Sequence, residues 1–354
     1  MDNPQDSLNV GFMTSGGLAP CLSSSIASLL SSYMALSTPF TARLYISGYK
    51  GILTGDSILL SNADIPALIE SFHKMGGSPI GSSRVKLTNV EDCISRGYVP
   101  KGKVPLEVAA EQLKKDGVNV LHTIGGDDTN TQAGQLSFHL AKKGYELQVI
   151  GMPKSFVPFS SPGLPTMNTY DIHALYIPEI SVDIASEGAR LRAVMDKYDC
   201  VNIFLSEGAG VSDIVSEKEA MGESVSRDAF GHVRLESINP GAYFASKFKA
   251  LVGAEKVLVQ KSGYYARSSP ALTYDRELIQ KCADVAVQGA ISGISGVAGQ
   301  DDMSGEFRVI EFERIKGEKP FNVGQKWFED MTAEIGAYGN EREVRASFVN
   351  SKGA

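Results

Sequence analysis

The sequence predicts an α/β protein of two lobes, the first of which is built around a mainly parallel sheet. Short apolar runs alternate with longer amphipathic runs along the first half of the chain, which is typical of βα units. Glycine-rich turns follow two of the apolar runs, at the positions where open α/β sheets bind their ligands. The length of 354 residues is enough for two domains of ordinary size.

The first half contains segments with the apolar character of buried strands and others with helical periodicity. The expected strands cover 8–13, 40–47, 118–124 and 147–152. The expected helices cover 22–36, 65–75, 106–116 and 130–143. Because strands and helices alternate, all of these segments fit one doubly wound sheet.

The character of the chain changes at 153–168, where the run PKSFVPFSSPGLPTMN holds four prolines and no periodicity, so we expect a loop there. Beyond it the expected strands cover 172–177, 201–205, 256–259 and 307–312, and the expected helices cover 182–197 and 275–291. The polar residues after Gly339 are expected to fray. The expected division is a first lobe at 1–154, a loop at 155–170, a second lobe at 171–335 and a tail at 336–354.

Composition and charge argue against several classes of protein. The formal net charge is −7 and no basic stretch stands out, which argues against a nucleic-acid partner. The N-terminus is polar and acidic, and no run approaches the roughly 18 apolar residues of a membrane span, so we expect neither a signal peptide nor a membrane anchor. Four widely separated cysteines without metal-ligand spacing indicate free thiols and a cytoplasmic protein.

The first glycine turn, Thr14-Ser15-Gly16-Gly17, lies between an expected strand and an expected helix. Glycines at such a position let the backbone approach an anion, and the following helix presents free N–H groups and a partial positive charge. A tight strand-to-helix turn without a ligand explains these residues equally well.

The second turn, Gly125-Gly126-Asp127-Asp128-Thr129, also follows a buried strand. Two adjacent carboxylates at a strand end suit Mg²⁺, which prefers one or two carboxylates together with phosphate oxygens and water. The alternative is a helix cap, since Asp and Thr commonly satisfy free N–H groups at that position. Because two aspartates follow two glycines, we favour the metal–phosphate interpretation.

A polar loop at 76–84 ends in Arg84, and Lys86 follows two residues later. The fork-shaped guanidinium of arginine is suited to bidentate contact with phosphate. From these residues alone, a plain surface loop is an equally good interpretation.

Two segments of the second half carry groups that suit a sugar phosphate. Glu207 follows an expected strand in the run SEGAG, and a carboxylate there can accept hydrogen bonds from sugar hydroxyls. Tyr264 and Arg267 lie in the run KSGYYAR, where they can bind a phosphate-bearing sugar. Taken singly, each segment is better explained as a capping acid or a solvated basic loop, and only their co-occurrence favours a ligand site.

Other catalytic signatures are missing from the sequence. The five histidines show no HExxH spacing, and we find no Gly-x-Ser-x-Gly elbow, Walker A lysine or complete GxGxxG fingerprint. His122 lies within an apolar strand and is expected to be a core residue. We set aside a nicotinamide-dependent Rossmann enzyme, because the glycine spacing and the ribose-binding acid are missing.

The chain resembles the phosphofructokinase superfamily, and most of all its pyrophosphate-dependent branch, in eight blocks taken in order: VGFMTSGGLAP, GGSPIGSSRVKLTN, LHTIGGDDTNT, VIGMPK, NIFLSEGAG, RDAFGHVRL, INPGAYF and VQKSGYYARSSPA. The resemblance covers 8–154 and 171–328, most of the chain. It implies a two-lobed phosphofructokinase-like fold with Rossmann-like parallel-sheet lobes, incomplete around 155–170. The implied reaction is phosphoryl transfer from diphosphate to the 1-hydroxyl of fructose 6-phosphate, with Mg²⁺ as cofactor, in glycolysis and gluconeogenesis.

The resemblance also implies roles on the diphosphate side. By this likeness Gly16 and Gly17 lie against the diphosphate, Asp127 holds the metal, and Lys154 binds the phosphoryl donor. Asp128 stands where ATP-using relatives have glycine. A carboxylate there would crowd and repel the α-phosphate of a nucleotide while leaving room for diphosphate.

On the acceptor side, the resemblance implies that Glu207, Tyr264 and Arg267 bind the sugar phosphate and that Arg84 reaches phosphate. The implied partners are diphosphate and fructose 6-phosphate, in a homo-oligomer like those of the family. We expect no nucleic-acid or membrane partner.

The sequence departs from the family pattern directly after Lys154. The family's catalytic base lies in a Pro-Lys-Thr-Ile-Asp-Asn-Asp motif, whereas here the letters SFVP follow and no carboxylate appears before Asp171. The downstream Met-Gly-Arg motif, which contacts the sugar in the family, is also missing. The catalytic base is therefore unassigned, and losing base and acceptor contacts together is expected to cost several powers of ten in rate.

Three explanations fit this departure: a gene model that skipped an exon, a real deletion, or a non-catalytic member of the family. We favour the first, because the flanking blocks keep so much of the family pattern. Two functions follow from the sequence: a diphosphate-dependent phosphofructokinase, or a catalytically impaired member that acts as a ligand-binding or regulatory subunit.

Overall fold

The computed structural model describes residues 8–145, 147–154, 172–226, 233, 238–261, 267–315 and 322–335. The chain forms two compact units, which we describe one at a time. The first consists of Met1–Val157 and Ser262–Glu318, and the second of Pro158–Lys261 and Lys319–Ala354. The proline-rich loop expected at 155–170 and the expected tail fall outside the described residues.

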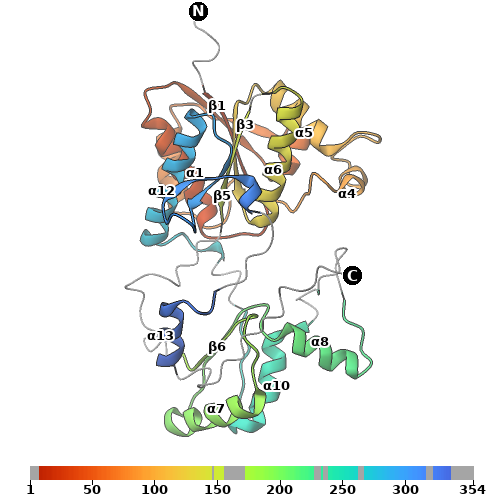
Figure 1. Cartoon of the computed structure of the whole chain (residues 1–354), viewed down its shortest axis with the longest axis vertical. Helices are drawn as coiled ribbons and strands as arrows, with labels where there is room; N and C mark the ends of the chain where they lie inside the picture. Colours follow the sequence, from red (N-terminus) through yellow and green to blue (C-terminus); the bar gives the residue numbers. More distant parts are fainter. Residues whose placement is uncertain are drawn as a thin grey trace, which may run out of the picture. The chain divides into compact units, whose positions relative to one another are not determined.

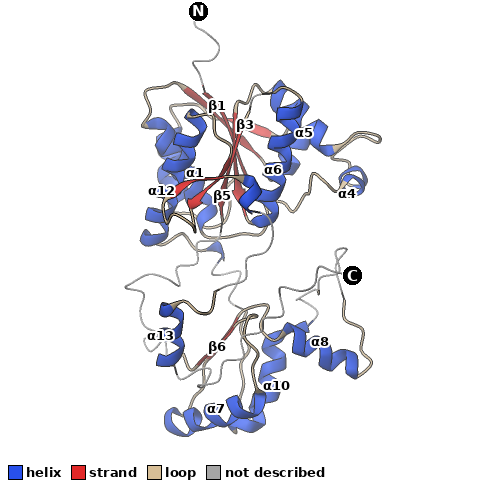
Figure 2. Ribbon diagram, viewed as in Figure 1, coloured by secondary structure: helices blue, strands red, loops and turns tan. Residues whose placement is uncertain are grey.

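The first unit is built on a seven-stranded sheet in the order β3-β2-β1-β4-β5-β8-β9 (Figure 2). The central strands from β2 to β8 are parallel, and β3 and β9 pair antiparallel at the two edges. The strands are β1 (Leu8–Thr14), β2 (Phe40–Tyr45), β3 (Ser57–Leu59), β4 (Val120–Gly125), β5 (Gln148–Pro153), β8 (Gly296–Gln300) and β9 (Phe307–Ile310). The parallel α/β class expected from the sequence is therefore confirmed.

Helices cover both faces of this sheet (Figure 1). They are α1 (Cys21–Met34), α2 (Tyr49–Thr54), α3 (Ile65–His73), α4 (Val90–Ser95), α5 (Pro105–Lys115), α6 (Asp127–Lys142), α12 (Thr273–Ile291) and the 3₁₀ helix η2 (Phe312–Ile315). Phe12 belongs to the core under α1, α3 and α12, whereas its neighbour Met13 belongs to the core under α2, α5 and α6. This alternation follows from the two-residue period of a strand, which sends successive side chains to opposite faces.

Every strand and helix expected in the first half is present, with one informative shift at α6. We expected this helix to begin at residue 130, but it begins at Asp127. Asp127 and Asp128 therefore occupy the first turn of the helix instead of a loop before it. Three short elements, β3, α2 and α4, were not expected, because fewer than seven residues give too little periodicity to detect.

The expected boundary of the second lobe is wrong for 262–318. These residues return to the first unit, where β8 pairs with β5 and β9 pairs with β8. Helix α12 packs beside α1 on one face of the same sheet. Pairing between strands so far apart along the chain is decided by tertiary contacts, which local patterns do not record.

The second unit contains a parallel pair of strands, β6 (Ala174–Tyr176) and β7 (Ile203–Leu205). Its helices in the described part of the chain are α7 (Ile184–Tyr198), α8 (Val211–Ala220), α10 (Pro240–Val252) and α13 (Lys326–Glu334). Tyr176 packs against Phe244 and Phe248 of α10 at the centre of this core.

The strand expected at 256–259 is wrong. These residues form no ladder with any described strand, and Leu258 is 71% exposed. Their apolar character resembles that of a strand, but a strand also requires a hydrogen-bonded neighbour.

Two smaller expectations are confirmed by the structure. His122 is fully buried, and its Nε2 lies 2.8 Å from the Tyr33 hydroxyl. Burial lowers the pKa of His122 to about 3, so the imidazole is neutral. The four cysteines are free thiols. Among the described helices, none has the length and apolar character needed to cross a membrane.

Candidate anion site at the ends of three parallel strands

The carboxyl ends of three neighbouring strands of the first unit, β1, β4 and β5, lie side by side. Thr14 of β1 pairs with Ile124 of β4, and Gly125 of β4 pairs with Pro153 of β5. Because these strands are parallel and in register, the segments that follow them lie next to one another. The Lys154 backbone N–H also donates to the Gly125 carbonyl, at 3.0 Å. The fold thus brings together both glycine turns and Lys154.

The loop that ends in Arg84 is bonded to the first glycine turn. The Gly16 N–H donates to the Ser83 carbonyl at 2.9 Å, and the Ser82 hydroxyl donates to the Gly16 carbonyl at 2.8 Å. These bonds hold the arginine beside Gly17, where an added Cβ would lie 3.8 Å from Arg84 Nη2. The loop is therefore part of the site and not a plain surface loop.

The Lys154 side chain extends across three glycines. Its Nζ donates to the Gly17 carbonyl at 3.1 Å. A Cβ added to Gly16 or Gly17 would lie 3.3 or 3.4 Å from that Nζ, and one added to Gly126 would lie 3.5 Å from Lys154 Cε. A side chain at any of these positions would fill the space around the ammonium, so glycine keeps that space open for a ligand.

Positive charge gathers in this space. Burial lowers the pKa of Lys154, and the charges of Arg84 and then Arg267 lower it further. Asp127 acts in the opposite direction. Within the described residues, neither Lys154 nor Arg84 forms an ion pair. Three neighbouring cations form the electrostatic pattern of an anion site.

The two aspartates lie on the α6 side of the site. The N-cap of α6 is Gly126, which has no side chain to offer, so neither aspartate is the helix cap that we considered as an alternative. As residues of the first turn, Asp127 and Asp128 complement the positive end of the helix dipole. Both are exposed and available for further contacts.

Asp128 has a partner that the sequence did not reveal. Lys86 Nζ lies 3.2 Å from Asp128 Oδ1. Gln132 fixes the geometry of this pair, because its Oε1 accepts the Leu87 N–H at 2.6 Å and its Nε2 donates to the Asp128 carbonyl at 3.2 Å. The residues lie more than 40 positions apart, so no local pattern predicted the contact.

The site also includes a thiol that we had not assigned to it. Cys21, the first residue of α1, donates its Sγ–H to the Lys154 carbonyl. This bond and the Gly125 contact hold the lysine backbone from two directions.

The residues present fit a magnesium ion that arrives with its phosphate ligand. The described part of the chain holds no cluster of three or more His, Cys, Asp or Glu side chains that could cage a metal. Mg²⁺ commonly uses one or two carboxylates and takes its other ligands from phosphate and water. Asp127 and Asp128 are both exposed carboxylates of this kind, and Asp127 is close enough to Lys154 to affect its pKa.

The expected sugar-phosphate residues belong to different units of the chain. Arg267 belongs to the first unit and contributes to its cation cluster. Glu207 is exposed in the turn after β7 of the second unit. Tyr264 lies outside the described residues.

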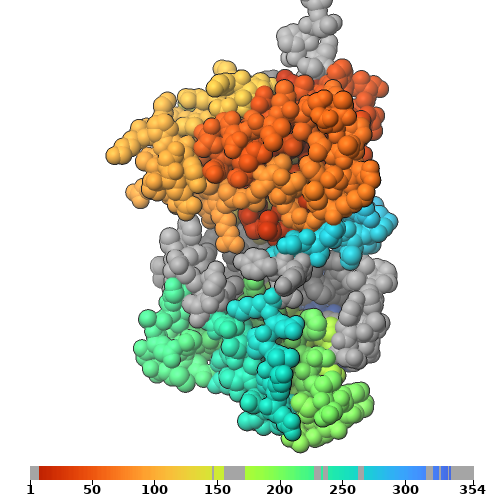
Figure 3. All heavy atoms as spheres, turned by 180° about the vertical axis from the view of Figure 1, so that it is seen from behind, coloured from red at the N-terminus to blue at the C-terminus, as the bar shows by residue number. Residues whose placement is uncertain are grey.

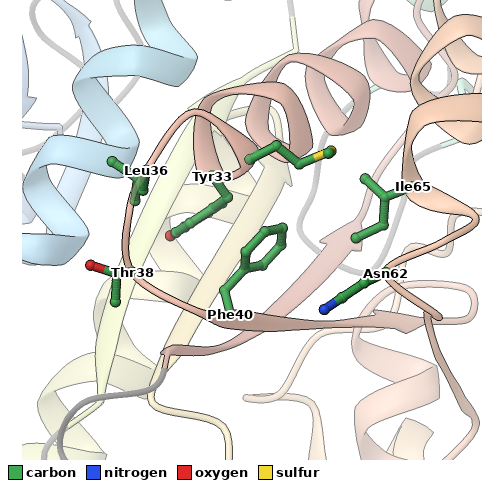
Figure 4. Close-up of a pocket in the computed structure, with 7 residues that line it drawn as sticks. Tyr33, Leu36, Thr38, Phe40, Asn62 and Ile65 are labelled. Carbon is green, nitrogen blue, oxygen red and sulfur yellow. The ribbon is translucent and has the colours of Figure 1, made fainter.

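A separate hollow of about 160 Å³ lies at the amino end of β2, whereas the candidate site lies at the carboxyl ends of the strands (Figure 4). Its lining includes Met34 at the end of α1 and Phe40 at the start of β2. The one large polar ring in it, Tyr33, uses its hydroxyl to contact His122. We assign no function to this hollow.

Taken together, the fold and the cation cluster define an α/β protein with a positively charged site at the carboxyl ends of its central strands. Comparison with known proteins narrows the class. Residues 9–156 match the family model described as Phosphofructokinase. The chain is 45% identical to a pyrophosphate–fructose 6-phosphate 1-phosphotransferase of Methylotuvimicrobium alcaliphilum, in an alignment covering 92% of this chain and 96% of that protein. It belongs to the phosphofructokinase family.

Two further comparisons agree with this placement. A pyrophosphate–fructose 6-phosphate 1-phosphotransferase of Mastigamoeba balamuthi is 44% identical, over 92% of this chain and 96% of that protein. The crystal structure of a pyrophosphate-dependent phosphofructokinase from Marinobacter aquaeolei has a TM-score of 0.63 at 16% identity, covering 94% of this chain and 92% of that one. The latter likeness establishes the shared fold.

The lengths of these alignments carry additional information. The alignment with the Methylotuvimicrobium protein spans 396 positions, more than the 354 residues of this chain. Gaps must therefore fall in this chain, opposite residues that the relative has and this chain lacks. The family match ends at residue 156, close to the departure noted after Lys154.

Proposed function

We propose that this chain is a diphosphate-dependent 6-phosphofructokinase, which transfers a phosphoryl group from diphosphate to the 1-hydroxyl of fructose 6-phosphate with Mg²⁺. The observation that carries the proposal is the position of Lys154 and Arg84 beside the glycine turns, with Arg267 close enough to Lys154 to lower its pKa. The choice of substrates is supported by the names of two relatives that are each 44–45% identical to this chain. We also infer a cytoplasmic location, which the free cysteines favour, and a homo-oligomer, by likeness to the family.

In this proposal the diphosphate lies against Gly16 and Gly17, between Lys154 and Arg84. Phosphoryl transfer depends mostly on positioning and on neutralising charge, and cations held in place before the ligand arrives supply both. Asp127 is the proposed magnesium ligand. When bound, the ion would supply positive charge to neutralise the phosphate oxygens.

Asp128 is proposed to select the donor. An ionised carboxylate at this position repels the additional phosphate of a nucleotide more than it repels the shorter diphosphate. Lys86 holds that carboxylate at 3.2 Å, so Asp128 is fixed in place and partly neutralised when diphosphate binds. Lys86 is thus proposed to offset the repulsion that Asp128 would otherwise exert on the correct donor.

The sugar phosphate is proposed to use Glu207, Tyr264 and Arg267, as the family resemblance implies. Support from the structure is direct only for Arg267, whose charge belongs to the cation cluster of the first unit. We propose the 1–154 region as the diphosphate- and magnesium-binding part of the chain.

A second candidate function is binding of the same phosphate ligands with little or no transfer. The observation that favours it is the alignment longer than the chain, together with the absence of any carboxylate between Lys154 and Asp171. Without a base to take the hydroxyl proton, the reaction loses about 10²- to 10⁴-fold in rate. Such a chain would serve as a ligand-binding or regulatory subunit.

The test pairs a coupled turnover assay, with diphosphate, Mg²⁺ and fructose 6-phosphate, with calorimetric binding of magnesium diphosphate. We expect clear binding and slow turnover. Rapid turnover would rule out the second candidate, and binding without turnover would rule out the first. Failure of the folded chain to bind diphosphate would contradict both. A transcript read across codons 154–171 would show whether a Thr-Ile-Asp-Asn-Asp segment belongs there.

A further inference from the structure

A second pocket of the first unit lies among α1, α3 and the first turns of α12. Its volume is about 280 Å³. In Figure 3 light-blue atoms around the start of α12 reach the surface beside orange residues of the first hundred. The pocket is lined by Ser28, His73, Thr273, Arg276, Glu277 and Gln280. None of these residues has a role in the function proposed above.

Three of the residues that line this pocket each carry a polar atom that is buried without a hydrogen-bond partner. These atoms are Ser28 Oγ, His73 Nδ1 and Arg276 Nε, and they come from three different helices. Ser28 is completely buried. Each unsatisfied buried group costs about 1–3 kcal/mol, so three around one pocket call for a physical explanation.

The chemistry of these atoms indicates the kind of ligand that would satisfy them. The Nε–H of arginine can only donate, and a serine hydroxyl and an imidazole nitrogen can both donate as well. A ligand that satisfies all three at once is therefore rich in acceptor oxygens.

The charges around the pocket point the same way. The His73 imidazole lies beside the Arg276 guanidinium, and burial together with that charge lowers the pKa of His73. In the described part of the chain no carboxylate forms an ion pair with Arg276, whose side chain makes only a long 3.5 Å contact with Thr273 Oγ1. Thr273 and Arg276 also lie in the first turn of the 19-residue helix α12, where the helix dipole favours negative charge.

Neighbouring acids do not neutralise the donors. Asp275, in the same turn, accepts the Leu272 N–H at 3.1 Å and is not part of the lining. Glu277 is exposed at the rim. Gln280 directs its amide to Ser32 and Asp284 on the far side, at 2.9 and 2.8 Å.

We propose that this pocket binds a small oxyanion of the size of inorganic phosphate, held by Arg276, His73 and Ser28. Such a site is separate from the diphosphate site, because the two share no residue. It stands on its own geometry and does not depend on the proposed function.

The test follows the histidine ring resonances of the full-length chain during titration with inorganic phosphate, with His73→Gln assigning the His73 signal. We expect a saturable shift of the His73 signal in the millimolar range. Arg276→Gln and Ser28→Ala each remove one donor and should weaken this binding, roughly tenfold or more for the charged group. Lys154→Met, which disables the diphosphate site, should leave it unchanged.

A parallel titration with acetate shows whether the pocket prefers a phosphate or a carboxylate, since both groups present acceptor oxygens. Saturation by either probe supports the site and names its preferred ligand class. The proposal fails if the His73 signal does not saturate with either one. It also fails if the shift persists in both donor variants or disappears in Lys154→Met, because the response would then report another site. Ser28→Ala removes a single oxygen and keeps the test valid if Arg276→Gln does not fold.

Discussion

The ion pair between Lys86 and Asp128 gives a sharp prediction about donor binding. If Lys86 acts by offsetting Asp128, then Lys86→Met should weaken diphosphate binding, and adding Asp128→Asn should restore it. The two atoms are 3.2 Å apart, with the lysine side chain 30% and the aspartate side chain 79% exposed. Solvent screening of so open a pair limits its strength to about 1 kcal/mol.

That energy corresponds to about fivefold in affinity, and the multiple charges of diphosphate raise the expected loss for Lys86→Met to between about five- and tenfold. The double variant should return to within about twofold of the wild-type chain, because a neutral residue 128 no longer needs an offsetting charge. The assay is calorimetric titration with magnesium diphosphate at constant ionic strength, since salt screens the effect.

Lys143→Met provides a matched control. Lys143 caps the opposite end of α6 and pairs with Glu107 at 3.6 Å, so the same charge is removed away from the glycine turns. Its diphosphate affinity should equal that of the wild type. The reasoning is refuted if the double variant binds as weakly as Lys86→Met alone, which would mean that Lys86 contacts the diphosphate itself. An unchanged affinity in Lys86→Met would refute it as well.

Three further predictions follow from the structure. Gly17→Ala would place a methyl 3.4 Å from Lys154 Nζ, so we expect at least about tenfold weaker diphosphate binding with an unchanged melting temperature; a variant that binds normally would show that the space is not used. Because the pKa of Lys154 is lowered, its ammonium group loses its proton at a lower pH than an ordinary lysine, and the affinity for diphosphate should fall as pH rises through that range. The Lys154→Arg variant should keep its affinity there, because arginine stays charged. Identical pH profiles of the two proteins by calorimetry would contradict this prediction. His122 has a folded-state pKa of about 3 against an unfolded value near 6.5, so its contribution to stability is complete above pH 6.5 and is lost as pH falls towards 3. Between pH 6.5 and pH 5, the free energy of unfolding measured with urea should therefore fall by about 2 kcal/mol less in His122→Gln than in the wild type. Equal falls in the two proteins would refute the assignment.

The longer helices and the apolar strands of the first half could be read from the sequence because each has a strong period, whereas the short elements β3, α2 and α4 could not. Apolar runs predicted β1, β4 and β5, and the glycine turns after β1 and β4 marked the edge of the sheet where the site lies. Once those strands are parallel neighbours, Gly16, Gly17 and Lys154 meet without further information. This part of the candidate site was therefore within reach of sequence reasoning.

The contacts that complete the site were not within reach. Gln132 bonds to the backbone of Leu87 and of Asp128 and so helps to bring Lys86 to Asp128, and such a long-range side-chain contact leaves no local trace. The return of 262–318 to the first sheet was missed for the same reason. At 256–259 the opposite error occurred, since apolar composition indicated a strand that has no described neighbour to pair with.

The start of α6 shows how a boundary error of three residues affects chemistry. We expected Asp127 and Asp128 in a loop before the helix, but both belong to its first turn. There they complement the helix dipole and remain exposed to a ligand. The capping interpretation fails because Gly126 is the N-cap, whereas the metal-binding interpretation is compatible with a place in the first turn. Helix ends are the least certain part of any pattern-based prediction.

The most direct test of the central claim compares magnesium diphosphate with magnesium ATP as ligands of the intact, folded chain. Lys154 and Arg84 lie beside the glycine turns, Arg267 acts on Lys154, and Asp128 is proposed to exclude nucleotides. Calorimetry should therefore give saturable diphosphate binding and ATP binding weaker by about tenfold or more. Equal affinity for both ligands, or no heat of binding with diphosphate, would contradict the account.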